Sequence, residues 1–126
     1  MQRIHHVAII CSNYEVSKRF YTEILGFPIL RETYRPARQS YKLDLQVGER
    51  DQIELFSFPH PPQRVSNPEA CGLRHLAFAV EDLDAIVADL TTKGVTLEPI
   101  RWDELTGKRF TFFKDPDNLP LEIYEL

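Results

Sequence analysis

The second half of this 126-residue sequence repeats the first half. The first copy contains His6-Val7-Ala8-Ile9, which aligns with His75-Leu76-Ala77-Phe78 in the second copy. It also contains Ile53-Glu54-Leu55, which aligns with Leu121-Glu122-Ile123 at almost the same spacing. An internal repeat constrains architecture strongly, because each copy has to fold as one supersecondary unit. We therefore expect a single domain over residues 1–126 that is built of two copies of one unit.

Each unit, residues 4–58 and residues 73–126, has the pattern of one strand, one helix and three further strands. Alternating apolar residues mark the first strand, and apolar residues at helical spacing follow it at once. The predicted apolar stripe of the first helix consists of Val16, Phe20 and Ile24. The later strands are expected at residues 29–34, 41–47, 52–58, 96–100, 109–113 and 121–124. A proline-rich linker, residues 59–72, joins the two units, and the predicted fold class is α+β.

Composition and charge exclude several classes of protein. The 15 basic and 19 acidic residues are not gathered into a tail or a stripe, which argues against nucleic acid as a partner. No apolar run approaches the roughly 20 residues of a membrane-spanning helix, and the first residues lack the apolar region of a signal peptide. The two cysteines, Cys11 and Cys71, are too few for a disulfide framework or a Cys-based zinc site. We expect a cytoplasmic protein.

Alternation along the strands separates an apolar face, which the helix must cover, from a second face of mixed character. The expected core face consists of Val7, Ile9, Leu43, Leu45, Val47, Ile53 and Leu55 in the first unit and of Leu76, Phe78, Val80, Phe110, Phe112, Leu121 and Ile123 in the second. The second face is expected to carry His6, Ala8, Lys42, Asp44, Gln46, Glu54 and Phe56, and then His75, Ala77, Ala79, Arg109, Thr111, Phe113, Glu122 and Tyr124. Because small residues leave room beside the histidines and polar groups converge there, this face predicts a lined cavity.

The second face repeats one histidine and one glutamate at equivalent positions. His6 corresponds to His75, and Glu54 corresponds to Glu122. Each of these residues alone is typical of an ordinary strand, but chance does not place His on His and Glu on Glu across a repeat. Two imidazole nitrogens and two carboxylates suit a borderline divalent ion and leave positions for water or substrate. The four residues therefore predict a site for one divalent metal ion: Ni, Zn, Co, Mn or Fe.

Four stretches carry a resemblance to a known superfamily. They are Ile4-His5-His6-Val7-Ala8-Ile9, Phe20-Tyr21-Thr22-Glu23-Ile24-Leu25-Gly26-Phe27, Gly72-Leu73-Arg74-His75-Leu76-Ala77-Phe78 and Phe113-Lys114-Asp115-Pro116-Asp117-Asn118-Leu119-Pro120-Leu121-Glu122. Across essentially its whole length the chain resembles the vicinal oxygen chelate superfamily, which includes glyoxalase I, extradiol dioxygenases and fosfomycin-resistance transferases. The resemblance implies tandem βαβββ units that form a half-open barrel around a metal site, and a homodimer.

The order of the acidic and histidine ligands resembles that of glyoxalase I. The order His, Glu, His, Glu of that branch is reproduced by His6, Glu54, His75 and Glu122. The resemblance implies a metal-dependent lyase or isomerase that binds two adjacent oxygens of a small substrate. Glu54 or Glu122, or a metal-bound hydroxide, would then move the proton between neighbouring carbons. The groups expected to orient a polar, anionic substrate are Lys42, Asp44, Arg109 and Tyr124.

Two positions depart from the glyoxalase I pattern. Ile10 stands where bacterial glyoxalase I has a basic residue that helps to hold glutathione, and Phe58 stands where it has an asparagine with the same role. The resemblance therefore implies a substrate other than the glutathione adduct. The alternative function is that of a bleomycin-resistance type of protein, which sequesters a small molecule and carries no metal.

Overall fold

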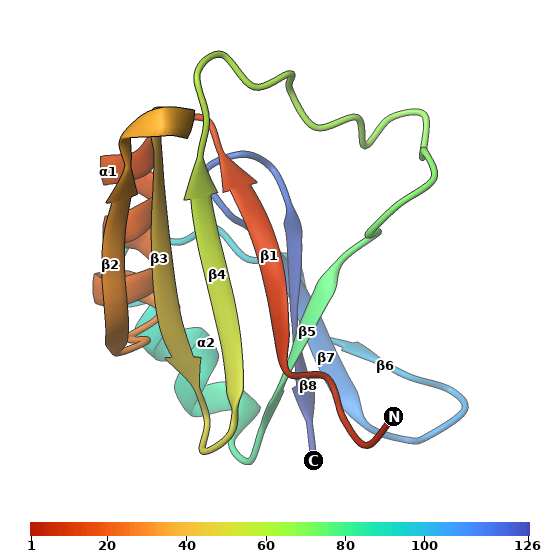
Figure 1. Ribbon diagram of the computed structural model, residues 1–126. Coiled ribbons are helices and arrows are strands. Elements are labelled where there is room, and N and C mark those ends of the chain that lie inside the picture. Colours follow the sequence, from red (N-terminus) through yellow and green to blue (C-terminus); the bar gives the residue numbers. More distant parts are fainter. The chain divides into compact units, whose positions relative to one another are not determined.

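The computed structural model describes residues 1–126 and divides them into two compact units, Met1–Gln63 and Arg64–Leu126. The division falls inside the expected linker, residues 59–72. Each unit contains one strand, one helical segment and three further strands, in that order (Figure 1). The predicted α+β class with two tandem βαβββ units is confirmed.

The first unit is a mixed four-stranded sheet in the order β1-β4-β3-β2. Its elements are β1 (His6–Cys11), α1 (Tyr14–Arg19), the π-helical η1 (Phe20–Ile24), β2 (Ile29–Arg35), the 3₁₀ turn η2 (Pro36–Arg38), β3 (Ser40–Val47) and β4 (Asp51–Ser57). The first strand pairs with the last in parallel, and the other pairs are antiparallel. The helical segment covers one face of this sheet (Figure 1). We call the opposite face, which carries His6, Lys42 and Glu54, the open face of the unit.

The second unit repeats this topology with the strand order β5-β8-β7-β6. Its elements are β5 (Leu76–Val80), α2 (Leu83–Thr92), β6 (Arg101–Trp102), β7 (Arg109–Lys114) and β8 (Pro120–Glu125). As in the first unit, the first and last strands of the sheet pair in parallel. The open face of this unit is the one that carries Glu122. Neither α1 nor α2 has the length and hydropathy that a membrane-crossing helix needs.

The core of each unit lies on the face of the sheet that its helix covers. In the first unit the core face of the sheet matches the expectation, and its most buried members are Ile9, Leu43, Leu45, Ile53 and Leu55. In the second unit Leu121 and Ile123 of β8 pack with Leu83 and Leu90 of α2, and all four are almost fully buried. Burial of such side chains stabilises each unit by roughly 1.5–3 kcal/mol per residue.

The predicted apolar stripe of the first helix was correct at Phe20, which is 7% exposed, and wrong at Val16. Val16 is 50% exposed, whereas Tyr14, Ser17 and Tyr21 are buried. The helix begins after Asn13, whose side chain accepts a hydrogen bond from the backbone N–H of Val16. After six residues it widens into the π-helical segment η1, and the wider turn changes which residues share a face. An apolar stripe predicted at 3.6 residues per turn therefore matches the buried face of this helix only in part.

The strand expected at residues 96–100 is not formed, and the edge strand β6 consists of Arg101 and Trp102 alone. Pro99 lies inside the expected strand and has no N–H to donate to a ladder. The segment stays beside β7 through Glu98, whose N–H donates to the carbonyl of Phe112 and whose carbonyl accepts from the hydroxyl of Thr111. A side-chain hydrogen bond thus replaces part of the strand ladder.

Candidate functional site

A histidine and a glutamate meet on the open face of the first unit. The parallel register of β1 and β4 places Ala8 directly opposite Glu54, and His6 stands two residues earlier on the same face of β1. Nε2 of His6 lies 3.6 Å from Oε2 of Glu54. The imidazole is 41% exposed and the carboxylate 16% exposed, so the glutamate is the more enclosed partner. Ala8 has a small side chain, which leaves room beside His6 and Glu54 on this face of the sheet.

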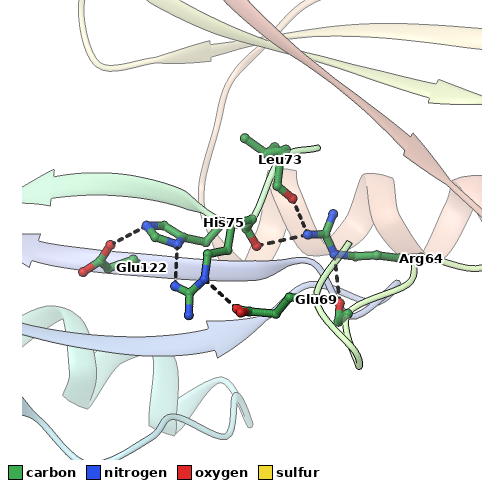
Figure 2. Close-up of polar contacts among 7 residues, drawn as sticks. Arg64, Glu69, Leu73, His75 and Glu122 are labelled. Atoms are coloured by element: carbon green, nitrogen blue, oxygen red, sulfur yellow. Dashed lines mark hydrogen bonds and ion pairs between the residues drawn. The ribbon is translucent and has the colours of Figure 1, made fainter. Parts of the chain in front are cut away.

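The second unit contains the equivalent pair. Ala77 of β5 lies opposite Glu122 of β8, and His75 stands two residues before Ala77. Nε2 of His75 lies 3.1 Å from Oε2 of Glu122 (Figure 2). The two units therefore present one imidazole and one carboxylate each at equivalent positions: His6 opens β1, and His75 directly precedes β5. This equivalence of position is what the repeat predicted.

The two glutamates differ in their basic neighbours. Nζ of Lys42 lies 2.8 Å from Oε1 of Glu54 and 2.8 Å from Oδ1 of Asp44. Hydrogen bonds to Asp44 and then to Glu54 raise the pKa of the Lys42 ammonium above its ordinary value, which keeps it charged. Glu122 has no ion-pair partner other than His75. The carboxylate of Glu54 is thus held in place by an ammonium group, and that of Glu122 is not.

A loop that is held by hydrogen bonds and one ion pair precedes His75. The guanidinium of Arg64 donates to the carbonyls of Leu73 and Arg74 and to the hydroxyl of Ser66, and Arg74 pairs with Glu69 at 2.7 Å (Figure 2). These contacts join both ends of the segment that precedes β5. His75, which is the next residue, is therefore presented from an ordered backbone.

The prediction that Arg109 lies on the face of Glu122 was wrong. The register of β7 and β8 pairs Phe112 with Glu122 and Phe110 with Tyr124, so the two phenylalanines occupy the open face. Arg109 lies on the helix-covered face, where its guanidinium pairs with Glu125 of β8 and with Asp84 of α2. Thr111 and Phe113, also predicted for the open face, are buried on that same face with Leu121 and Ile123.

Two aromatic residues that sequence reasoning assigned to the core therefore belong to the candidate site. The ring of Phe112 meets the imidazole of His75 edge to face at a centroid distance of 5.2 Å. Phe110 stacks on Tyr124 at 6.3 Å. The guanidinium of Arg101 lies over both phenylalanines, 5.1 and 5.4 Å from their centroids. Arg101 is thus a basic residue of this open face, and no sequence pattern singled it out.

Tyr124 is on the open face, as expected, but its hydroxyl already has partners. It donates to Oδ2 of Asp103 at 3.0 Å and contacts the hydroxyl of Thr106. The backbone N–H of Leu105, and next the Tyr124 hydroxyl, hydrogen-bond to Asp103 and hold the pKa of that carboxyl below its ordinary value. Tyr124 therefore fixes the hairpin between β6 and β7 beside the site.

The donor chemistry of each pair fits a divalent metal ion. Nowhere in residues 1–126 do three or more His, Cys, Asp or Glu side chains gather into a group that could hold a metal ion. Each unit instead supplies two donors, an imidazole nitrogen and a carboxylate oxygen, which are the donor types that zinc and similar ions accept. His5 also contacts the first pair, since its Nδ1 lies 3.0 Å from Nδ1 of His6.

The tandem βαβββ units and their repeated His–Glu pairs define a class of protein. The chain belongs to the Glyoxalase/Bleomycin resistance protein/Dioxygenase superfamily, whose family model matches residues 3–123. Proteins of this superfamily usually bind a divalent metal ion, bind small molecules and often form dimers.

Individual relatives are similar over nearly the whole chain. Uncharacterized protein YwkD of Bacillus subtilis (strain 168) is 62% identical over 99% of this chain and 98% of its own length. Uncharacterized protein YaeR of Escherichia coli (strain K12) is 59% identical over 99% of this chain and 97% of its own. The crystal structure of a glyoxalase family protein from Enterococcus faecalis superposes with a TM-score of 0.92 at 52% identity, covering 98% of both chains.

A more distant structure is that of an enzyme. The trypanothione-dependent glyoxalase I of Leishmania major is 26% identical and superposes with a TM-score of 0.74, over 99% of this chain and 87% of its own.

Proposed function

We propose that this protein is a divalent-metal-dependent lyase or isomerase of the glyoxalase I type, acting on a small molecule with two neighbouring oxygen atoms. The observation that carries the proposal is the repeated pair: His6 with Glu54 and His75 with Glu122, at equivalent positions of the two units. The likeness to the glyoxalase I of Leishmania major supports the reaction type.

In this proposal each unit supplies two of the four ligands of one metal ion. The ligands are His6, Glu54, His75 and Glu122. A divalent ion bound there would supply Lewis-acid polarisation of a substrate carbonyl and would stabilise negative charge on the neighbouring oxygen. Proton transfer and the orientation of the substrate are assigned to side chains of the protein.

The proton transfer is assigned to Glu122 in preference to Glu54. Lys42 holds the carboxylate of Glu54 at 2.8 Å, whereas no ammonium or guanidinium group pairs with Glu122. A base that takes a proton from one carbon and returns it to the next has to move between them, and a carboxylate without a second tether does so more easily. Glu54 is then the fixed carboxylate of the site.

The substrate is oriented by polar groups on the open faces. Lys42 and Asp44 flank Glu54, and Tyr124 closes the second face beside Phe110. Arg109 is left out of this proposal, because its guanidinium is neutralised by Glu125 and Asp84 on the other face of the sheet. Phe110 and Phe112 would exclude water from the reacting atoms.

The thiol handle of the substrate is proposed to differ from glutathione. Ile10 is 55% exposed on the open face of β1 and offers no charge to a carboxylate of the cosubstrate. The relative from Leishmania major depends on trypanothione, so a different thiol is compatible with this fold. We also propose a cytoplasmic homodimer.

The test combines metal analysis with a substrate screen. Purified protein should contain close to one divalent ion per chain, and the metal-loaded form should isomerise α-keto aldehyde adducts of one of several thiols in the presence of nickel, cobalt, manganese or zinc. Glu122→Gln should abolish turnover, while Glu104→Gln, which removes an exposed carboxylate from the β6–β7 hairpin, should leave it unchanged. Metal-free protein that binds a small molecule tightly and turns over no adduct would favour the sequestering function instead.

A further inference from the structure

Two arginines and two phenylalanines form a cluster at one end of the open face of the first unit. The cluster consists of Arg35 at the end of β2, Arg38 in the turn η2, Phe56 in β4 and Phe58 just after it. The guanidinium carbon of Arg35 lies 4.9 Å from the ring centroid of Phe56 and 6.0 Å from that of Phe58. The guanidinium carbon of Arg38 lies 5.3 Å from the centroid of Phe58.

The strand register places this arginine–phenylalanine cluster on the same face as Glu54. Phe56 is two residues beyond Glu54 on β4, and β3 presents Lys42 directly opposite Phe56. The two phenylalanine rings are nearly parallel, with an interplanar angle of 6°. The rings are stacked, and both guanidinium groups lie within 6.0 Å of at least one ring centroid. The polar edges of the guanidinium groups are therefore not used by the aromatic rings.

Neither arginine of the cluster has an acidic partner. One Nη of Arg35 donates to the hydroxyl of Ser40 at 3.0 Å, but its Nε–H is buried and has no acceptor. No carboxylate lies within ion-pair distance of either guanidinium, whereas other arginines of the chain, such as Arg109, do form ion pairs. A buried donor without an acceptor destabilises the folded state, so its presence requires an explanation.

We propose that Arg35 and Arg38 bind an oxyanion, a carboxylate or phosphate group, at the far end of the substrate. A planar guanidinium recognises such groups with paired N–H donors, and the orphaned Nε–H of Arg35 supplies one of them. Binding of the oxyanion itself is independent of any metal. Its role as the tail of the substrate rests on the proposed function.

The spacing along β4 specifies the length of that substrate. A strand advances about 3.3 Å per residue, so the cluster begins about 7 Å from Glu54 at Phe56 and ends about 13 Å away at Phe58. The substrate class is therefore a molecule with two adjacent oxygens at one end and an anionic group about 7–13 Å away. Lys42, which stands opposite Phe56 and whose Nζ lies 2.8 Å from Glu54, would face the part of the molecule nearest Glu54.

The first test needs no metal. Inorganic phosphate and acetate are titrated into the full chain, and the Nε–Hε signals of arginine side chains are followed by NMR. We expect saturable shifts in the low millimolar range for the signals that disappear in Arg35→Gln and Arg38→Gln, and none for the signal of Arg19. Arg19 lies on α1, across the sheet, and is paired with Glu23. Linear shifts of equal size at all arginines would overturn the proposal.

The second test uses the metal-loaded protein and hydroxamates, which chelate a metal through two adjacent oxygens. Three compounds share one six-methylene chain that ends in a carboxylate, a phosphonate or a neutral amide. We expect one of the anionic compounds to bind at least tenfold more tightly than the amide, and this preference to be lost in Arg38→Gln and kept in Arg19→Gln. Because Arg38 is exposed, its replacement does not endanger folding.

The hydroxamate with the neutral amide tail distinguishes a failure of this inference from a failure of the proposed metal-dependent function. Equal binding of all three hydroxamates would show that the metal site exists and that the arginines do not select a tail, which overturns this inference alone. If no hydroxamate binds but phosphate still shifts the signals of Arg35 and Arg38, the oxyanion site stands and the proposed metal function fails.

Discussion

Nζ of Lys42 lies 2.8 Å from Oε1 of Glu54, on the oxygen that does not face His6. An ammonium group in this position competes with a metal ion for the same carboxylate and repels it by charge. We expect Lys42→Met to tighten the binding of a divalent ion by about tenfold, which corresponds to about 1.4 kcal/mol. Competition with a chromophoric chelator measures the change. Lys93→Met, which removes an exposed lysine paired with Asp89, is the matched control and should change nothing.

Replacement of a ligand should have a much larger effect than replacement of its neighbour. We expect Glu122→Gln to weaken metal binding by more than about a hundredfold, because the amide oxygen is a poorer donor and carries no charge. His5→Gln should weaken it by less than about tenfold, since His5 only contacts His6 from the side. The same chelator competition measures both. Equal metal retention in the two variants would remove Glu122 from the ligand set.

Metal affinity should fall as the pH is lowered from about 7 to about 5. Ligating imidazoles must be deprotonated, and imidazole in model peptides titrates near pH 6.5. The expected loss is steeper than for a site made of carboxylates alone. Metal content after equilibration at a series of pH values measures it, and a flat profile across this range would mean that histidines do not bind the metal.

Stability at acid pH should depend on Glu125. Hydrogen bonds from Arg109 hold the pKa of the Glu125 carboxyl below its ordinary value of 4.5. A carboxyl with a lowered pKa in the folded state stabilises the protein above its unfolded-state pKa, and this stabilisation is lost as the pH falls through the folded-state value. We expect Glu125→Gln to lower the free energy of unfolding at pH 7 and to make it less dependent on pH below about 4.5.

Urea unfolding at pH 7, 5 and 3 measures this dependence. Glu104→Gln in the exposed β6–β7 hairpin is the control, because Glu104 makes no ion pair and should leave the pH profile as it is. If Glu125→Gln and the wild-type protein lose stability in parallel below pH 5, the ion pair with Arg109 makes no contribution of this kind.

Turnover of the methylglyoxal–glutathione adduct should be weak. Loss of one charge-assisted contact at Ile10 costs roughly 1.5–3 kcal/mol of binding, which is about tenfold or more in affinity. We expect kcat/KM below about 10⁴ M⁻¹s⁻¹ for this adduct, the lower end for dedicated enzymes. A higher value that falls in Arg38→Gln would show that the arginine–phenylalanine cluster holds glutathione in place of the missing contact at Ile10.

The sequence predicted the first unit better than the second, and the reason is physical. In β4 the polar residues Gln52 and Glu54 alternate with the buried residues Ile53 and Leu55, so that polarity and burial agree. In β7 they disagree, because Phe110 and Phe112 line the open face while Thr111 is fully buried. Hydrophobicity cannot distinguish a packed core from an apolar surface that surrounds a site.

Two compensating contacts explain why β7 tolerates this reversal. The hydroxyl of Thr111 donates to the carbonyl of Glu98 at 2.6 Å, so its burial leaves no polar group without a partner. Arg109 is neutralised by Glu125 and Asp84, which lie on other elements of the unit. These partners are distant in sequence, and period-two alternation carries no information about them. The His–Glu pairs could be predicted because the repeat itself marks them.

Because the first and last strands of each unit pair in parallel, each His–Glu pair forms only after the last strand of its unit has been synthesised. In each unit the imidazole precedes the first strand's alanine and the carboxylate lies in the last strand, so the imidazole is synthesised before the carboxylate. A nascent chain that has not yet released β4 has no His–Glu pair, and one that lacks β8 has only the first. Under the proposed function, a chain in which β8 has not yet paired with β5 would offer only two of the four metal ligands, so full metal binding would have to follow the folding of both sheets.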